Sequence, residues 1–120
     1  MSYDFLIFKP RMPIRSQNDL SEDTVELQNP KIVMRALASL LPSLSWQQRR
    51  EDSYWEAHVE DDGMWYEFHV GPGDDTAWSI KTSHRTTNHP LVPRICMELE
   101  VTAFDGQAML IIDKNGTRPA

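Results

Sequence analysis

The segment Tyr54–Val70, with the sequence YWEAHVEDDGMWYEFHV, constrains the fold more than any other part of the chain. Its centre, Asp62-Gly63, is a strong hairpin signal, because a two-residue type I′ turn requires positive φ at both central positions. A turn there pairs apolar residues with apolar ones and charged residues with polar or oppositely charged ones: Trp55/Val70, Glu56/His69, Ala57/Phe68, His58/Glu67 and Val59/Tyr66. A slip of one residue would destroy both agreements, so we expect an antiparallel hairpin in this register.

Alternation of apolar and polar residues continues on both sides of this hairpin. A turn at Asp52-Ser53 would align the preceding strand through the pairs Trp46/Val59, Gln47/His58 and Arg49/Glu56. After a loop at 71–76, a strand over 77–84 would place Lys81 beside Glu67 and turn three residues inward: Trp78, Ile80 and Thr82. The pattern predicts a four-stranded antiparallel meander with one apolar and one polar face.

The first forty residues predict a strand, a loop and a helix. Tyr3–Phe8 is a short apolar run that indicates a buried strand, and Arg11–Gln28 indicates a loop with little regular structure. Asn29-Pro30 is a good helix start, with Asn29 as N-cap and Pro30 in the first turn. An apolar stripe at helical spacing follows and ends before Pro42; its members are Val33, Ala36, Leu37, Leu40 and Leu41.

The segment 90–104 is compatible with two structures. Val92, Ile95, Cys96 and Leu99 have helical spacing, whereas Ile95, Met97, Leu99 and Val101 also alternate as in a strand that would turn at Asp105-Gly106. We favour the helix, because the apolar face of the meander needs a second element to cover it. The apolar run Ala108–Asp113, which ends at Asn115-Gly116, indicates a final strand.

The predicted fold is therefore a single α+β domain over residues 1–120. We expect a two-layer sandwich in the order β-α-β-β-β-β-α-β, with the meander and the terminal strands in one layer and both helices on one face. A chain of 120 residues is long enough to bury one real core.

Charge and composition exclude several classes of function. The net charge of −6 argues against a nucleic-acid-binding protein, which needs a basic surface, and is compatible with a basic protein partner. Cys96 is the only cysteine, so neither an internal disulfide nor a cysteine-based zinc site is possible. The N-terminal sequence has no signal-peptide pattern and no membrane-spanning length of apolar residues, so we expect a cytoplasmic protein that does not bind membranes.

Four potential ligands share the polar face of the meander: Glu56, His58, Glu67 and His69. Two imidazoles and two carboxylates could hold zinc or act as an acid–base pair. The alternative is a solvated sheet face with alternating charge, which Arg49 and Lys81 favour because cations oppose metal binding. We expect neither a metal nor a cofactor. No serine lies in a Gly-x-Ser-x-Gly motif, and Gly71-Pro72-Gly73 lacks the lysine of a phosphate loop, so we expect no catalytic residues.

Two kinds of residue are candidates for binding a partner. Trp65 faces away from the apolar side, and an outward Trp is either covered by another segment, here the loop 11–28, or used in recognition. Carboxylates are concentrated in loops and strand ends: Asp19, Glu22, Asp23, Glu26, Asp61, Asp62, Asp74 and Asp75. His84 and His89, which flank a loop, are expected at the surface.

The chain resembles small bacterial immunity proteins, which neutralise antibacterial toxins delivered between competing cells. The resemblance lies in the opening Met1-Ser2-Tyr3-Asp4, the amphipathic helix, the strand meander and the closing run Ala108–Asp113. It implies a helix before the last strand and a non-enzymatic role in binding a cognate toxin. The alternative from another class is a small enzyme or metal-binding protein that uses the four-residue patch.

Overall fold

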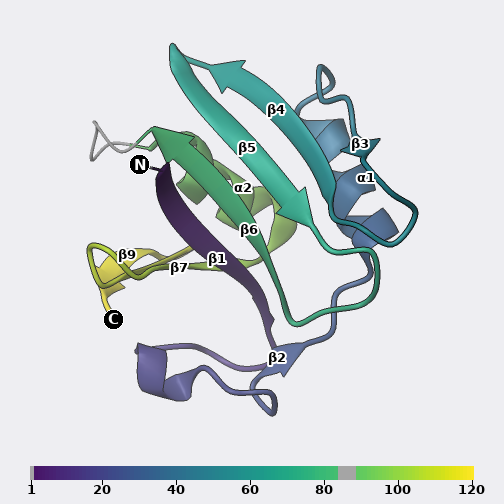
Figure 1. The fold of residues 1–120 in the computed structure, drawn as a ribbon. Coiled ribbons are helices and arrows are strands. Elements are labelled where there is room, and N and C mark those ends of the chain that lie inside the picture. Colours follow the sequence, from purple (N-terminus) through teal and green to yellow (C-terminus); the bar gives the residue numbers. More distant parts are fainter. Residues whose placement is uncertain (1, 84–88) are drawn as a thin grey trace.

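One antiparallel sheet of nine strands and two α-helices form the fold of residues 2–83 and 89–120, the part of the chain that this computed structural model describes (Figure 1). The strands are β1 (Ser2–Pro10), β2 (Val25–Glu26), β3 (Gln47–Gln48), β4 (Trp55–Asp61), β5 (Met64–Val70), β6 (Ala77–Ser83), β7 (Thr102–Asp105), β8 (Leu110–Asp113) and β9 (Gly116–Pro119). The helices are α1 (Pro30–Leu40) and α2 (Leu91–Leu99), with a short 3-10 helix, η1 (Gln17–Asp19). The predicted α+β class is confirmed.

The N-terminal strand lies in the middle of the sheet. The strand order is β3-β4-β5-β6-β1-β7-β8-β9, with β2 paired to the end of β1. Phe5 is opposite Ile80 on β6 and Asp105 on β7, so β1 joins the meander to the C-terminal strands. The central position explains the apolar run, because Phe5 and Ile7 are fully buried beneath the helices.

The predicted hairpin register is confirmed for all five pairs between β4 and β5. Asp62 and Gly63 have φ values of 52° and 77°, as the turn requires. On the next strand Lys81 lies opposite Glu67, also as predicted. The residues expected to face inward on β6 are buried: Trp78, Ile80 and Thr82.

The predicted register between the strand that precedes the hairpin, β3, and its partner β4 is wrong by two residues. Gln47 pairs with Glu56 rather than His58, and Arg49 lies outside the short strand β3. The turn is centred one residue earlier, because the Ser53 N–H donates to the Arg50 carbonyl oxygen at 3.0 Å. Side chains support this wider turn: the Gln48 amide donates to the Glu51 and Ser53 carbonyl oxygens at 3.0 and 2.9 Å. Such side-chain-to-backbone bonds select a turn that alternation alone does not reveal.

Helix α1 forms as predicted. The Asn29 side chain accepts from the Lys31 and Ile32 N–H groups at 2.9 and 3.4 Å, and the helix ends at Leu40. Val33 and Leu37 are buried in the main core together with residues from the meander. In Figure 1 both helices lie behind the sheet, so the core lies between the helices and the rear face of the sheet.

The C-terminal third combines the two structures that the sequence allowed. Residues 91–99 are helical, whereas Thr102–Asp105 form a strand that leads through a turn into β8. Glu100, with φ of 54°, ends the helix in the left-handed conformation. The predicted order of elements lacked β2, a separate β7, and β9. Asn115-Gly116 does not end the sheet but turns the chain into β9, where Gly116 has φ of 119°.

Candidate functional site

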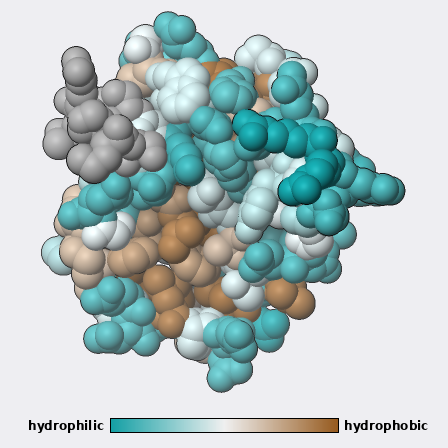
Figure 2. All heavy atoms as spheres, viewed as in Figure 1, coloured by the Kyte–Doolittle hydropathy of each residue, from teal (hydrophilic) through white to brown (hydrophobic). Residues whose placement is uncertain are grey.

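The sheet face opposite the helices contains two chemically different regions. Over β4–β6 its outward residues are mostly polar, whereas apolar side chains gather over β1 and β7 (Figure 2). The exposed Leu6 lies opposite Phe104 in this second region. We call the first region the polar face; its outward residues are Glu56, His58, Glu60, Trp65, Glu67, His69, Ser79 and Lys81.

Trp65 is exposed on the polar face. Its side chain is 42% accessible, and its ring lies 5.7 Å from that of His58. The loop 11–28 does not cover it, because β2 pairs with Lys9 and Pro10, at the end of β1 away from the hairpin turn. Of the two alternatives for Trp65, the structure therefore leaves the one in which the ring is available for recognition.

His69 lies between two carboxylates on the same face. Its Nε2 atom is 2.6 Å from Glu67 Oε1, and its Nδ1 atom is 3.7 Å from Glu56 Oε1. All three side chains are partly buried. Among the described residues, Nε2 makes no bond that meets hydrogen-bond geometry despite the short distance, so the contact with Glu67 is an ion pair when the imidazole is protonated.

One potential ligand atom from each of these three residues lies within 4.8 Å of the others. A metal ion could therefore contact Glu56, Glu67 and one nitrogen of His69. His58 is exposed and does not belong to this group, so the structure brings together three of the four potential ligands. The two ring nitrogens point to opposite sides, so a single ion can use only one of them. A protonated imidazole, in contrast, uses both carboxylates.

The acidic candidates divide between the two ends of the sheet. Asp61 and Asp62 lie at the β4–β5 turn, near Trp65. The other candidates lie at the opposite end, where backbone bonds of 2.7 and 3.2 Å join Gln28 to Asp75. Most are exposed: Glu22, Asp23, Glu26, Asp74 and Asp75. Because consecutive antiparallel strands run in opposite directions, successive loops lie at opposite ends of the sheet.

Asp19 has a structural role within the acidic loop. Its Oδ2 atom accepts from the Arg15 and Ser16 N–H groups at 2.8 and 3.4 Å, and the Ser16 side chain accepts from Asn18 N–H. This capping box begins η1. The Asp19 carboxylate therefore fixes the local backbone, whereas the exposed carboxylates beyond it remain candidates for contact with a partner.

His89 is buried, which corrects the expectation of a surface position; His84 lies outside the described residues. The His89 ring lies 5.3 Å from that of Tyr3 and 5.4 Å from that of Phe5. The Tyr3 hydroxyl donates to Asp105 Oδ2 at 2.6 Å. Burial, and then the Asp105 carboxylate, raise the pKa of Tyr3 to about 12. These aromatic contacts explain the burial of His89 beside the core.

Sequence patterns did not reveal a cleft of about 630 Å³ at the end of β1. It is bounded by the segment 9–15, the start of β7 and the β8–β9 turn, which are far apart in the sequence. The missed signal was the hairpin at Asn115-Gly116: its strand β9 brings Arg118 beside the N-terminal loop. Neither this cleft nor a smaller one beside α1 is lined by the His69 cluster.

No known protein family, curated protein or solved structure matches this chain. Within the described residues, neither helix has the length and apolar character needed to cross a membrane.

Proposed function

We propose that this protein is a non-enzymatic binding domain, and specifically an immunity protein that neutralises a basic antibacterial toxin in the cytoplasm. The observation that carries the proposal is the exposure of Trp65 on a sheet face that neither helix covers. A large aromatic side chain held on a rigid strand is suited to the centre of a protein interface, because it loses little conformational entropy on binding.

The charge around Trp65 favours a basic partner. Glu60 lies directly opposite Trp65, and Asp61 and Asp62 follow at the turn. Glu56 and Glu67 continue the acidic surface along the same face, where Lys81 supplies a cation opposite Glu67. A basic toxin would be attracted to this surface during the encounter, and the aromatic ring would then slow dissociation.

The acidic loop at the opposite end contributes differently in this proposal. Glu22, Asp23 and Glu26 lie too far along the sheet to share one compact contact with Trp65. Their charge still adds to the long-range field that attracts a basic partner. Neutralising these three residues should therefore lower the association rate and leave the dissociation rate nearly unchanged.

The test is binding kinetics with the product of a toxin gene adjacent to the gene for this chain. Trp65→Ala should raise the dissociation rate by about 30-fold, corresponding to a hot spot of about 2 kcal/mol. Tyr54→Ala is the matched control, because Tyr54 is 58% exposed but lies at the other end of β4. Association should slow as salt concentration rises. An unchanged dissociation rate in Trp65→Ala, or the absence of any toxin partner, would contradict the proposal.

The second candidate function is metal binding or acid–base catalysis at the His69 cluster. It is favoured by one observation, the 4.8 Å grouping of ligand atoms from Glu56, Glu67 and His69. Against it, Lys81 lies opposite Glu67, so a cation stands beside the carboxylates that would hold the metal. Metal analysis separates the two functions, and its expected outcome is given in the Discussion.

A further inference from the structure

The 630 Å³ cleft concentrates positive charge in an acidic protein. Glu100 and Asp113 are its only carboxylates among the described lining residues. Five cationic side chains outnumber them: Lys9, Arg11, Arg15, Lys114 and Arg118. The chain as a whole has 18 acidic and 12 basic residues, so the charge balance is reversed at this place. The cleft and Trp65 lie at opposite ends of the sheet.

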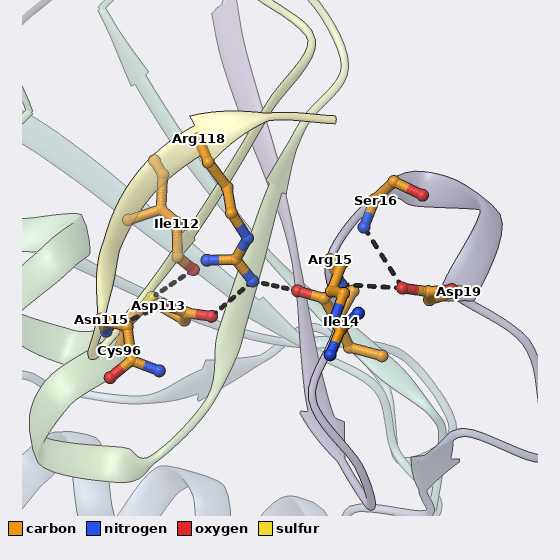
Figure 3. Close-up of polar contacts among 9 residues, drawn as sticks. All are labelled: Ile14, Arg15, Ser16, Asp19, Cys96, Ile112, Asp113, Asn115 and Arg118. Carbon is orange, nitrogen blue, oxygen red and sulfur yellow. Dashed lines mark hydrogen bonds and ion pairs between the residues drawn. The ribbon is translucent and has the colours of Figure 1, made fainter.

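Three side-chain hydrogen bonds fix the walls of the cleft, and two of them join segments distant in sequence. The Arg118 guanidinium donates to Asp113 Oδ2 at 2.8 Å and to the Ile14 carbonyl oxygen (Figure 3). Lys9 Nζ donates to the Leu99 carbonyl oxygen at 3.1 Å. The bond to Ile14 holds the N-terminal loop against β9, and the Lys9 bond joins β1 to the end of α2, so the cleft is formed before any ligand binds.

Two guanidiniums on this preformed wall are not used by the fold. Arg11 and Arg15 are exposed, and within residues 2–83 and 89–120 neither side chain has an ion pair. Their backbones are nevertheless anchored, because Arg11 N–H donates to the Thr24 carbonyl oxygen and Arg15 N–H to Asp19 Oδ2, both at 2.8 Å. Anchored arginines without a partner are well suited to bidentate bonds with an anion.

From this arrangement we infer that the cleft binds a small organic phosphate of mononucleotide size. The phosphate would accept hydrogen bonds from Arg11 and Arg15, with Lys114 adding charge. The organic part would contact the apolar wall, which includes Met12, Pro13 and Val101. The volume is that of a small-molecule site, which favours a compact ligand over an acidic segment of another protein. This inference is independent of the toxin-binding proposal.

Isothermal titration calorimetry of the full chain with adenosine monophosphate tests the inference. We expect binding that weakens with rising salt and is at least about tenfold weaker for adenosine, which lacks the phosphate. Arg11→Gln with Arg15→Gln should reduce the affinity for adenosine monophosphate by about tenfold or more. The matched control is Arg35→Gln with Arg49→Gln, which removes two exposed arginines outside the cleft and should leave the affinity unchanged.

Several results would overturn the inference. One is the absence of binding to the unaltered protein, and another is an equal loss of affinity in both double variants, which would reveal only an effect of net charge. Binding of a hexaglutamate peptide without binding of adenosine monophosphate would instead assign the cleft to an acidic protein segment. Lys114→Gln provides a further test with an exposed residue, and it should weaken binding without changing the thermal unfolding temperature.

Discussion

The two halves of the sheet differ in what lies on their outer face. In the β4–β6 half, helices cover one face and the other is open, so buried residues such as Phe68 alternate with outward residues such as Glu67. In the β7–β9 half, the adjacent Ile111 and Ile112 are only 0% and 7% exposed, although they point to opposite faces. Arg118, opposite Ile111, reaches the Ile14 carbonyl oxygen, which places the N-terminal loop over the outer face of β8.

The difference shows for which strands a sequence pattern can predict the buried face. Alternation marks the two faces only where one of them meets water. Where a loop covers the second face, both sets of residues become apolar and the pattern no longer distinguishes them. The first half should therefore tolerate outward substitutions, whereas the second half should be sensitive on both faces.

The largest expected loss of stability is in the β4–β6 half, the open half of the sheet. Phe68→Ala should lower the free energy of unfolding by about 3–5 kcal/mol, because it leaves a cavity in the main core. Glu67→Ala, one residue earlier on the outer face, should cost less than about 1 kcal/mol. Urea unfolding measures both. Comparable losses would mean that the two faces of this strand are not distinct.

In the β7–β9 half, where both faces of the sheet are covered, truncating either Ile111 or Ile112 should destabilise the fold. Ile111→Ala and Ile112→Ala should each lower the free energy of unfolding by about 2–5 kcal/mol, since both side chains are buried. The same urea experiment compares them. A loss below about 1 kcal/mol for Ile111→Ala would show that the N-terminal loop does not protect this face.

The open half is also where prediction from sequence succeeded. Asp62-Gly63 and the charge-matched pairs defined β4 and β5, and Asn29-Pro30 defined the start of α1. The pairing of β3 was wrong because it depends on Gln48 and Ser53 side-chain bonds to the turn. Strand β9 was missed because GTRP has neither alternation nor β-branched residues apart from one threonine. It is recruited by pairing with β8, which is a tertiary effect.

The candidate sites show the same division. His69 contacts Glu56 across the strand pair and Glu67 two residues earlier on β5, so both contacts follow from the hairpin register and the alternation of faces and could be predicted. The basic cleft could not, because Arg11 and Arg118 are brought together only by the β7–β9 strands and the loop that covers them. Separation along the chain, rather than weak residue preferences, concealed this site.

An intermediate loss of stability is expected when the ion pair between Asp113 and Arg118 in the β7–β9 half is broken. Asp113→Asn should lower the free energy of unfolding by about 1–3 kcal/mol at neutral pH, because it removes the charge-assisted bond to Arg118. Lys114→Gln is the control: its pair with Glu100 is exposed, so the loss should be below about 1 kcal/mol. Equal losses of unfolding free energy in the two variants would indicate that the Asp113–Arg118 pair does not stabilise the position of the N-terminal loop.

The same ion pair predicts a dependence on pH. Burial alone would raise the pKa of Asp113, but the bond from Arg118 and the Asn115 N–H outweigh it and lower the pKa. The stabilisation is therefore fully present above the ordinary aspartate pKa of about 4 and is lost as pH falls through the lower folded value. Urea unfolding between neutral and acidic pH should show a smaller acid-dependent loss in Asp113→Asn than in the unaltered protein.

The smallest expected effect concerns metal binding on the open face. Protein purified without added metal should contain no stoichiometric zinc by elemental analysis, because Lys81 lies opposite Glu67 and places a cation beside the carboxylates that would hold the ion. Added zinc should likewise raise the unfolding temperature by no more in the unaltered protein than in His69→Ala. His58→Ala is the control, since His58 is exposed on the same face but does not belong to the cluster. One zinc per chain, lost in His69→Ala and kept in His58→Ala, would make the open half a metal site and favour the second candidate function.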